Sequence, residues 1–500
     1  MAGASEVTLG TTVVDTDVVI SETDGHFICA TLDWSSAGSC RCGSCTWDHA
    51  SILNLNLSRQ VLLNAVKEFS PLKLRLGGSL EDMVTYQTDP NKVCKPFVAN
   101  ASAYFGYSDG CLSFARWDEL HEFFNKTGAV VVFGLNALNG RITLADGSLG
   151  GPWNHTNAES LIRYTAKKGY TMLGWEFGNE LSGEGVGTRI HAAQYAEDVI
   201  KLKSLVDQIY QDLPHEPLLI APAGFYEENW YAEFIDLTKS SSSVNVISHH
   251  LYSLGSGKDE HLVRNILDPF YLDDVSWTLS NLSALIKRTG TSAVAWVGEA
   301  GGAYGGGRHL VTDSFVSSFW YLDQLALSSK YGTKTYCRQS LIGECYGLLD
   351  TNTFKPNPDY YSALLWHKLM GPKVISVNFN GTNKIRAYAH CAKHSKGITL
   401  LLLNLDQTIG AQVEVSSKAT NSSNSGHLME STREDYHLTA ADGNLYSQTV
   451  LLNGEALLLN FFDEIPALKP IKVDSSQPIN VAPLSIVFVH MPSFHAPACL

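Results

Sequence analysis

Eight short apolar segments recur along the first 343 residues, and stretches with helical spacing separate most of them. The apolar segments cover residues 26–34, 72–78, 130–137, 173–180, 218–224, 244–252, 293–301 and 334–343. The helical spacing is found in residues 59–69, 117–127, 157–168, 192–211, 277–289 and 314–328. Buried strands that alternate with helices are typical of parallel sheets, and eight of them predict an α/β fold, the (β/α)₈ or TIM barrel. A doubly wound sheet is the alternative, but neither a phosphate loop nor a dinucleotide fingerprint follows the first strand.

The pattern changes near residues 370–372, because helical spacing is lost from there to the end of the chain. Short alternating runs replace it, at residues 385–390, 398–405, 412–415, 436–439, 455–459 and 485–490. Alternation of this kind predicts a C-terminal antiparallel β-sandwich. Residues 7–20 also alternate, and we expect them to join this sandwich because they have no other partner. The predicted organisation is an N-terminal strand segment (1–23), the catalytic barrel (24–372) and the sandwich (373–500).

Two of the apolar segments end on a glutamate. Glu180 closes the segment LGWEFGNE (173–180), and Glu299 closes AVAWVGE (293–299). The carboxyl ends of barrel strands carry the chemistry, and glycoside hydrolysis needs two carboxylates there, one as acid/base and one as nucleophile. A single Asn–Glu pair after a strand is more simply explained as a cap for the next helix. Two acids, each directly after an apolar strand, favour catalysis.

The charge balance limits which kinds of macromolecule the chain is expected to bind. The chain of 500 residues has a formal net charge of −14 and a pI near 5.6, without a block of Lys or Arg. A polyanion such as nucleic acid or heparan sulfate would be repelled at long range, so neither is predicted as a partner. The hydrophobic content of 44% is ample for a large core. No run approaches the ~20 apolar residues of a transmembrane segment.

Ten cysteines and several Asn-x-Ser/Thr sequons favour a secretory route. The sequons begin at Asn56, Asn100, Asn125, Asn154, Asn281, Asn380 and Asn421. Cys94 and Cys111 bracket one loop as a candidate disulfide. The start MAGASEVTLG contains no apolar leader, which we interpret as a mature terminus with a replaced leader; a cytosolic protein is the alternative. The triplet at positions 40, 42 and 45 has no matching His or Cys set, so disulfides or buried thiols are favoured over a metal.

Nine segments, in order along the barrel region, give a more specific signal. They are CATLDW (29–34), PLKLRLGGSLED (71–82), CLSFARWDEL (111–120), FGLNAL (133–138), WEFGNE (175–180), SHHLY (248–252), WVGEAGGAYGGG (296–307), CRQSLIGECYGLLD (337–350) and NPDYYSALLWHKLMGPKV (357–374). With these segments the chain resembles the plant members of the heparanase-like β-glucuronidases, glycoside hydrolase family 79. The resemblance implies a retaining exo-β-D-glucuronidase that uses two glutamates, needs no metal or organic cofactor and acts on a small-molecule terminal glucuronide.

The resemblance also implies roles for particular residues. Glu180 matches the general acid/base of the family, and Glu299 matches its nucleophile. The residues that match substrate-binding positions are Asp33, Ser79, Asn179, His249, Tyr252, Tyr304, Gly305, Gly306, Gln339 and Tyr346. Among these, Asn179 matches the group that contacts the sugar 2-hydroxyl, and residues 304–306 match the loop that holds the glucuronate carboxylate. A disulfide between Cys391 and Cys499 is implied in the same way.

Some of these positions can be argued from the residues themselves. Glycine N–H groups in succession form a nest for an anion, so residues 304–306 suit a carboxylate. A flexible surface loop is the alternative, which the position shortly after Glu299 disfavours. Arg308 either reaches the carboxylate or is solvated. His249 and His250 are adjacent on a strand and face opposite sides, so one of them points into the barrel mouth.

The loop after the fifth strand is rich in acidic and aromatic residues. Tyr226, Trp230 and Tyr231 could stack on an aglycone. Glu227 and Glu228 are better explained by a helix start, where acidic residues favour the N-terminus. No role is assigned to the glutamate at position 344.

The acidic composition and the aromatic loops favour a small aromatic aglycone, such as a flavone, over a charged polymer. Mammalian members of the family carry basic clusters for sulfated polymers, and this chain has none. An arabinogalactan or another cell-wall glycan is the alternative substrate. An alternative of a different class is a glycan-binding protein without turnover, which the intact pair Glu180 and Glu299 disfavours.

Overall fold

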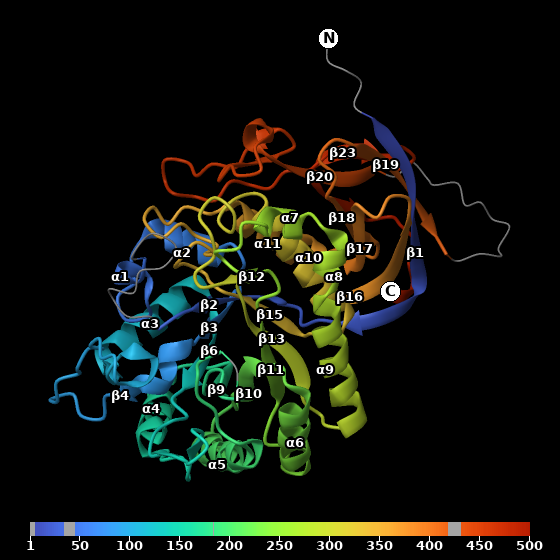
Figure 1. Cartoon of the computed structure of the whole chain (residues 1–500). Coiled ribbons are helices and arrows are strands. Elements are labelled where there is room, and N and C mark those ends of the chain that lie inside the picture. Colours follow the sequence, from blue (N-terminus) through green and yellow to red (C-terminus); the bar gives the residue numbers. More distant parts are fainter. Residues whose placement is uncertain (1–5, 35–45, 184, 419–431) are drawn as a thin grey trace.

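A closed barrel forms the centre of the fold (Figure 1). The computed structural model describes residues 6–34, 46–183, 185–418 and 432–500. Eight parallel strands close in the order β10, β11, β13, β15, β2, β3, β6, β9. Their bounds are β2 Ile28–Leu32, β3 Lys73–Leu76, β6 Val130–Leu135, β9 Gly174–Phe177, β10 Leu218–Phe225, β11 Val246–Leu251, β13 Val294–Ala300 and β15 Thr335–Arg338. Each strand falls on a segment predicted as a strand to within one residue at its outer limits, so the predicted fold class is confirmed.

Helices follow the barrel strands and cover the outside of the barrel. The longer ones are α2 Gln60–Lys67, α3 Phe114–Thr127, α4 Thr156–Lys167, α5 Ala192–Tyr210, α6 Glu228–Thr238, α9 Val275–Thr289, α10 Ser317–Lys330 and α11 Pro358–Leu369. The shorter ones are α1 Trp47–Ala50, α7 Leu262–Ile266 and α8 Pro269–Asp273. Local sequence sets the ends of α3: Ser113 Oγ accepts a hydrogen bond from the N–H of Arg116, and Gly128 ends the helix in a left-handed conformation (φ 70°).

The connections at the carboxyl ends of the strands carry small two-stranded sheets. The pairs are β4 Val84–Tyr86 with β5 Gly110–Leu112, β7 Ile142–Thr143 with β8 Leu149–Gly150, and β12 Gly255–Ser256 with β14 Ala303–Tyr304. The last pair ties the loop after β11 to the loop after β13. Gly257 extends this tie, because its N–H donates to the carbonyl oxygen of Tyr304 (2.9 Å). These connections shape the mouth of the barrel.

A large, mostly antiparallel sheet follows the barrel. Its strands are β1 Val7–Glu22, β16 Met370–Asn380, β17 Ile385–Ala392, β18 Ile398–Asn404, β19 Gly410–Ser417, β20 Thr432–Ala440, β21 Val450–Leu452, β22 Glu455–Ala456, β23 Ile471–Asp474, β24 Ile479–Val481 and β25 Ile486–Met491. They lie in the order β22, β21, β20, β25, β18, β17, β16, β1, β19, β24, with β23 beside β20. β1 pairs antiparallel with β16 and parallel with β19, and it is the blue strand within the orange and red sheet of Figure 1. The N-terminal strand therefore joins the C-terminal sheet, as predicted.

This single sheet curls around a core of its own, in the manner of a sandwich. Side chains from strands far apart in the sheet order share that core, among them Val14, Ile375, Val413, Ile479 and Val487. β18 is buried on both faces: Leu400 and Leu402 belong to this core, whereas Leu401 and Leu403 pack into the core of the barrel. Its continuous apolar sequence is expected for a strand in that position. The residue limits of the three predicted domains remain a prediction.

Three disulfides join pairs of described residues. Cys94–Cys111 and Cys391–Cys499 are the two pairs that the sequence suggests. The third, Cys29–Cys337, links β2 to β15, the first and last strands of the barrel. Disulfides or buried thiols are predicted for the cysteines at positions 40, 42 and 45, which lie outside the described residues. Among the described helices, none has the length and apolar character that crossing a membrane requires.

Candidate active site

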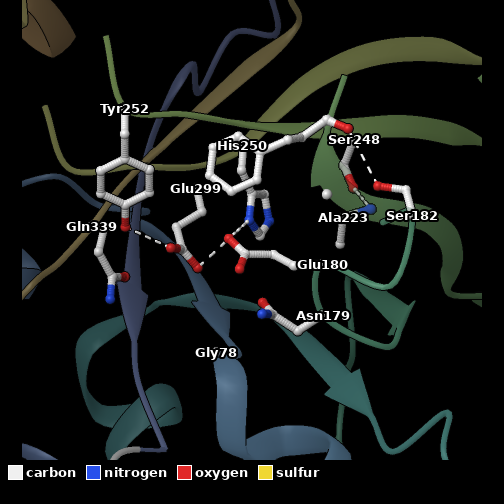
Figure 2. A network of polar contacts seen from close by, with 12 residues as sticks. Gly78, Asn179, Glu180, Ser182, Ala223, Ser248, His250, Tyr252, Glu299 and Gln339 are labelled. Atoms are coloured by element: carbon white, nitrogen blue, oxygen red, sulfur yellow. Dashed lines mark hydrogen bonds and ion pairs between the residues drawn. The ribbon is translucent and has the colours of Figure 1, made fainter. Parts of the chain in front are cut away.

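The two predicted glutamates meet at the carboxyl end of the barrel. Glu299 lies within β13, and Glu180 follows β9 by three residues. Ionisable atoms of Glu180, His250 and Glu299 all lie within 4.8 Å of one another, and Figure 2 shows the three side chains facing each other. Both glutamates are nearly buried, with 7% and 6% of the residue exposed. Carboxyl oxygens no more than 4.8 Å apart fit the about 5–5.5 Å between the carboxyl groups of retaining glycosidases better than the about 6.5–9.5 Å of inverting ones.

The chain turns sharply after β9 and brings Glu180 over the barrel. Gly178 (φ 68°) and Glu180 (φ 59°) both adopt the left-handed conformation, which costs about 1–2 kcal/mol for a residue other than glycine. The N–H of Glu180 donates to the carbonyl oxygen of Ala223 (2.7 Å), which holds the turn against the end of β10. Strained backbone held in this way is typical of functional sites.

A buried arginine, Arg75 in β3, holds Glu299 in place. Its guanidinium donates to Glu176 Oε1 (2.6 Å), Glu299 Oε2 (2.7 Å) and Asn179 Oδ1 (2.8 Å). Only 1% of the arginine side chain is exposed. The sequence prediction missed this residue. The available signal was a cation inside the apolar strand KLRL, where a charge is tolerated only if it is paired.

Glu299 is held as a carboxylate. Burial alone would raise its pKa, but His250, Arg75 and the hydroxyl of Tyr252 together outweigh burial and lower the pKa. The hydroxyl of Tyr252 donates to Glu299 Oε1 (2.6 Å). Gly301 permits this contact, because a Cβ at that position would lie 2.7 Å from the ring of Tyr252. An ionised and oriented carboxylate is suited to nucleophilic attack.

The pKa of Glu180 is shifted in the opposite direction. Burial raises its pKa, and the hydrogen bond with His250 Nδ1 (2.9 Å to Oε1) opposes that rise only in part. The negative charge of Glu299 adds to the rise. A carboxyl group that keeps its proton can serve as a general acid. Two neighbouring carboxyl groups with pKa values pushed apart are the arrangement that a general acid and a nucleophile require.

The histidine at the site is His250, whereas the sequence prediction named His249. Across β11 and β13, His250 pairs with Glu299 and His249 pairs with Val297. His249 is fully buried, burial lowers its pKa to about 3, and neither ring nitrogen has a hydrogen-bond partner among the described residues. The assignment is corrected to His250, because successive residues of a strand face opposite sides.

A further buried carboxylate, Asp82, lies behind the glutamate pair. Its two oxygens accept hydrogen bonds from the N–H groups of Ala137 and Asn179 (2.8 Å each). Burial raises the pKa of Asp82 to about 7, although these two N–H groups favour its charged form. Asp82 thereby fixes the backbone of the residue directly before Glu180. Its place inside the short helical segment SLED gave the sequence prediction no distinguishing signal.

A cavity of about 230 Å³ lies beside the glutamate pair. The described residues that line it are Asp33, Trp47, Ser79, Leu80, Phe105, Tyr107, Gly185, Val186, Glu344 and Tyr346. The list contains three of the predicted sugar contacts, Asp33, Ser79 and Tyr346. Gly185 brings the cavity against Glu180, because a Cβ there would lie 2.3 Å from Glu180 Oε2.

Asp33 and the predicted pocket residue Gln339 contact each other. Gln339 Nε2 donates to Asp33 Oδ2 (2.7 Å), and the N–H of Trp34 donates to Oδ1 (2.6 Å). Burial raises the pKa of Asp33 to about 7, and the charge of Glu299 adds to this. Gly78 allows the close approach, since a Cβ there would lie 2.1 Å from Asp33 Oδ1. This pair offers both donors and acceptors to a sugar hydroxyl.

The glycine loop after β13 offers unpaired donors. Residues 305–307 have φ values of 78°, 94° and 75°, and their N–H groups donate no hydrogen bond within the described residues. Gly306 and Gly307 are buried, where an N–H group needs an acceptor. The N–H of Cys345 donates to the carbonyl oxygen of Gly306 (2.9 Å), which places the loop beside Tyr346. The Tyr304 residue is 54% exposed.

Two residues whose roles the sequence left open have contacts at the rim. Arg308 Nη1 donates to the carbonyl oxygen of Asp259 (2.9 Å) and so bridges the loops after β11 and β13. Glu344 accepts a hydrogen bond from Trp47 Nε1 (2.5 Å) in the cavity wall. Arg308 therefore braces the glycine loop, and Glu344 braces the cavity wall through Trp47.

Within the described residues, two clusters have the side chains that could hold a cation. One is His309, Asp313 and Cys345, but Cys345 is disulfide-bonded and has no thiolate to offer. The other is Glu180, His250 and Glu299, where the guanidinium of Arg75 already supplies a positive charge to Glu299. We therefore assign the chemistry of the site to the side chains themselves.

Comparisons with known proteins agree with this geometry. The family model described as "Glycosyl hydrolase family 79, N-terminal domain" matches residues 9–326. Heparanase-like protein 3 of Arabidopsis thaliana is 52% identical, over 98% of this chain and 94% of the relative. Baicalin-beta-D-glucuronidase of Scutellaria baicalensis is 44% identical, over 95% and 90%. A 4-O-alpha-L-rhamnosyl-beta-D-glucuronidase from Fusarium oxysporum 12S shares the fold, with a TM-score of 0.70 at 16% identity over 96% of this chain and 100% of that one.

Proposed function

Because the chain belongs to glycosyl hydrolase family 79, we propose that it is a retaining exo-β-D-glucuronidase that acts on small aromatic glucuronides. The observation that carries this proposal is the convergence of Glu180 and Glu299 to within 4.8 Å. A relative that covers almost the whole chain is named as a β-D-glucuronidase, which supports the same activity. The opposite pKa shifts of the two glutamates support their roles.

In the first step, a carboxylate oxygen of Glu299 attacks the anomeric carbon of the glucuronide. The bond from that carbon to the aglycone oxygen breaks, and Glu180 gives its proton to the departing oxygen. The aglycone leaves as a neutral alcohol or phenol, and a glucuronyl ester of Glu299 remains. Protonation matters because an unprotonated glycosidic oxygen is a poor leaving group.

In the second step, water hydrolyses this ester. Glu299 carries no charge as an ester, so one cause of the raised pKa of Glu180 is removed. Glu180, now a carboxylate, accepts a proton from the water whose oxygen attacks the anomeric carbon, and Glu299 departs as a carboxylate. Arg75 is placed to stabilise that returning charge through Nη1. Two inversions at one carbon give net retention.

The glycine loop supplies the preference for a glucuronide over a neutral sugar. Residues 305–307 present unpaired N–H groups, and a carboxylate would provide the acceptors they need. Asp33 and Gln339 would contact sugar hydroxyls, and Asn179, next to Glu180, would contact the hydroxyl at C2. These assignments follow from the family and are supported by the positions of the side chains.

The size of the cavity supports action on one terminal sugar. Its volume of about 230 Å³ is smaller than the about 300–1,000 Å³ of sites that enclose drug-sized ligands. The net charge of −14 disfavours sulfated polymers as substrates. A small glucuronide with an uncharged aglycone, such as a flavone, is the substrate class that fits both properties.

We also assign the protein to the secretory route. Disulfides persist in oxidising compartments, and three are described here. The asparagines of most described sequons are exposed, namely Asn56, Asn100, Asn125, Asn154 and Asn380. Detection of N-glycans on the protein from its natural source is the direct check.

The proposal is tested with p-nitrophenyl β-D-glucuronide and NMR detection of the sugar anomer that forms first. We expect β-glucuronic acid before mutarotation. The α anomer would contradict double displacement, and the absence of turnover would favour a glycan-binding protein. Rates on a flavone glucuronide and on a glucuronidated arabinogalactan then decide the class of aglycone.

A further inference from the structure

A half-buried phenylalanine lies directly beside the acid/base. Phe225 is the last residue of β10. A Cβ built on Gly185 would lie 2.3 Å from Glu180 Oε2 and 3.0 Å from Phe225 Cε2, so the carboxyl group and the ring edge flank the same glycine. The Phe225 ring centre lies 6.3 Å from that of His250 and 6.2 Å from that of Tyr252. Phe225 therefore borders the site next to the proton donor and keeps part of its surface exposed.

The order of the barrel strands places Phe225 across the barrel from two of the predicted sugar contacts, Asp33 and Gln339. β10 lies four places from β2 around the closed ring of eight strands. Asp33 follows β2, and Gln339 follows the neighbouring β15. Because Glu180 protonates the glycosidic oxygen, the leaving group must lie on the side of Glu180. The sugar ring then fills the side of Asp33, and the aglycone is directed toward Phe225.

We propose that Phe225 is the stacking surface of the leaving-group subsite and that it selects planar aromatic aglycones. The inference rests on the glucuronidase function proposed above and names the residue that recognises the aglycone. Aromatic rings attract each other in offset and edge-to-face arrangements beyond the effect of buried area. An anionic leaving group would instead bring its charge toward the carboxyl groups of Glu180 and Glu299.

The other aromatic residues after β10 have structural roles, which corrects the hypothesis that they stack on an aglycone. Tyr231 is fully buried, and its hydroxyl donates to the carbonyl oxygen of Gly224 (2.7 Å). Trp230 Nε1 donates to the carbonyl oxygen of Ile190 (2.9 Å). The ring of Tyr226 lies 5.2 Å from that of Tyr231, within the helix layer. Phe225 is the residue of this segment that faces the glutamates.

The acidic residues of the same segment also have structural roles, in agreement with the helix-start interpretation. The side chain of Glu227 accepts hydrogen bonds from the N–H groups of Asn229 and Trp230 at the start of α6. Glu228 forms an exposed ion pair with Arg288 (3.0 Å). These contacts hold both carboxylates at the start of α6, so neither is assigned to the leaving-group subsite.

The experiment compares phenyl β-D-glucuronide with cyclohexyl β-D-glucuronide in the wild type, Phe225→Leu and Phe225→Tyr. We expect the ratio of kcat/KM for the phenyl over the cyclohexyl substrate to fall about fivefold to tenfold in Phe225→Leu, and to stay near the wild-type ratio in Phe225→Tyr. Leucine keeps apolar bulk without a ring, whereas tyrosine keeps the ring. Inhibition by the free flavone should weaken in Phe225→Leu in the same proportion.

Tyr226→Phe is the matched control, because it alters the neighbouring aromatic residue in the helix layer and should leave the ratio unchanged. An unchanged ratio in Phe225→Leu, with unchanged inhibition by the flavone, would overturn the role of Phe225 while leaving the glucuronidase function intact. If the folded wild type hydrolyses neither glucuronide, the proposed function fails and the inference fails with it. An equal fall of the phenyl-to-cyclohexyl ratio of kcat/KM in Phe225→Leu and in Tyr226→Phe would also overturn the specific role of Phe225.

Discussion

The lower and upper layers of the barrel interior contain different kinds of side chain. The lower layer, toward the amino ends, is an apolar cluster of Val132, Ile220, Val246 and Trp296. The upper layer, at the carboxyl ends, contains the buried charged groups Arg75, Glu176 and Glu299, with His250 beside them. On β13, two residues separate Trp296 from Glu299. Along β13, the interior therefore changes from apolar to charged between Trp296 and Glu299.

The two layers therefore contribute differently to the stability of the fold and to the reaction. Each Å² of apolar surface removed from water contributes roughly 25 cal/mol to stability. A buried ion pair must first repay the cost of desolvating two charges, and it often adds little net stability. The lower layer thus holds the barrel together, and the upper layer keeps its charges for the reaction. Substitutions in the upper layer should change the rate more than the stability, and those in the lower layer should do the reverse.

The largest effect is expected for Glu299→Gln in the upper layer. The amide cannot form the ester intermediate, so hydrolysis should fall by on the order of 10⁴-fold or more. Arg75 keeps its partner Glu176 in this variant, so the fold should persist. The measurement is kcat on p-nitrophenyl β-D-glucuronide together with a thermal unfolding curve. Full activity in the folded variant would refute Glu299 as the nucleophile.

Glu180→Ala should lower the rate by about 10²- to 10⁴-fold on substrates with poor leaving groups. Activated substrates, whose leaving groups need no protonation, should lose less. Azide can enter the space left by the carboxyl group and attack the glucuronyl ester without a base. We therefore expect added azide to restore turnover of an activated substrate and to yield β-glucuronyl azide. Absence of rescue with every leaving group would count against the acid/base role.

The lower part of the barrel is probed by removing the disulfide Cys29–Cys337. Cys29 pairs with Lys73, two residues below the register of Arg75, and the disulfide joins strands 308 residues apart. The double variant Cys29→Ala, Cys337→Ala should lose about 2–5 kcal/mol of unfolding free energy, because a long loop is freed in the unfolded chain. The kcat at 25 °C should remain close to wild type. A large loss of kcat with unchanged stability would break the distinction between the layers.

This disulfide also shows what barrel closure makes predictable from a sequence. The eight strands were found from apolar runs, and the two glutamates at strand ends converge because all carboxyl ends of a parallel barrel lie on one face. The same closure brings the first and last strands together. Cys29 and Cys337, each within one of these strands, could have been paired on that ground. The fold and the convergence of the two glutamates therefore follow from local patterns together with closure.

Contacts that depend on the exact register could not be predicted in this way. Alternation shows that His249 and His250 face opposite sides, but not which one faces inward. The pairing of β11 with β13 shifts between these two histidines, so that His250 lies opposite Glu299. Arg75 reaches Glu299 across the barrel, and no local pattern in either strand encodes that contact. The missed residues are thus those whose role depends on neighbours from distant strands.

Asp82→Asn tests a residue just outside the charged layer. The carboxylate accepts N–H groups on both oxygens, from Ala137 and Asn179, whereas asparagine has one acceptor and would turn an NH₂ group toward the other N–H. An unsatisfied buried donor costs about 1–3 kcal/mol, so kcat should fall about tenfold or more as Asn179 and Glu180 shift. A positioning role predicts a larger loss on poor leaving groups than on activated ones. Equal losses on both would indicate a purely structural effect, and Asp118→Asn on the outer surface serves as the control.

The smallest expected effect is a shift of the pH profile in His250→Gln. The wild type should show a bell with an acidic optimum, because activity needs Glu299 ionised and Glu180 protonated. His250 lowers the pKa of both carboxyl groups. Its removal should raise both pKa values, so activity is lost sooner on the acid side and persists further on the alkaline side, and the whole bell moves up by on the order of one pH unit.

The matched control for this shift is His249→Gln, which makes the same change one residue earlier on the face of β11 turned away from the glutamates. It should cost stability, because His249 is fully buried, and should leave both limbs of the pH profile in place. A bell that stays fixed in His250→Gln, or that moves as far in His249→Gln, would show that the histidine does not set the protonation of the glutamates. In that case the charged layer would consist of Arg75 and the carboxylates alone, and the contrast between the layers would rest on those ion pairs.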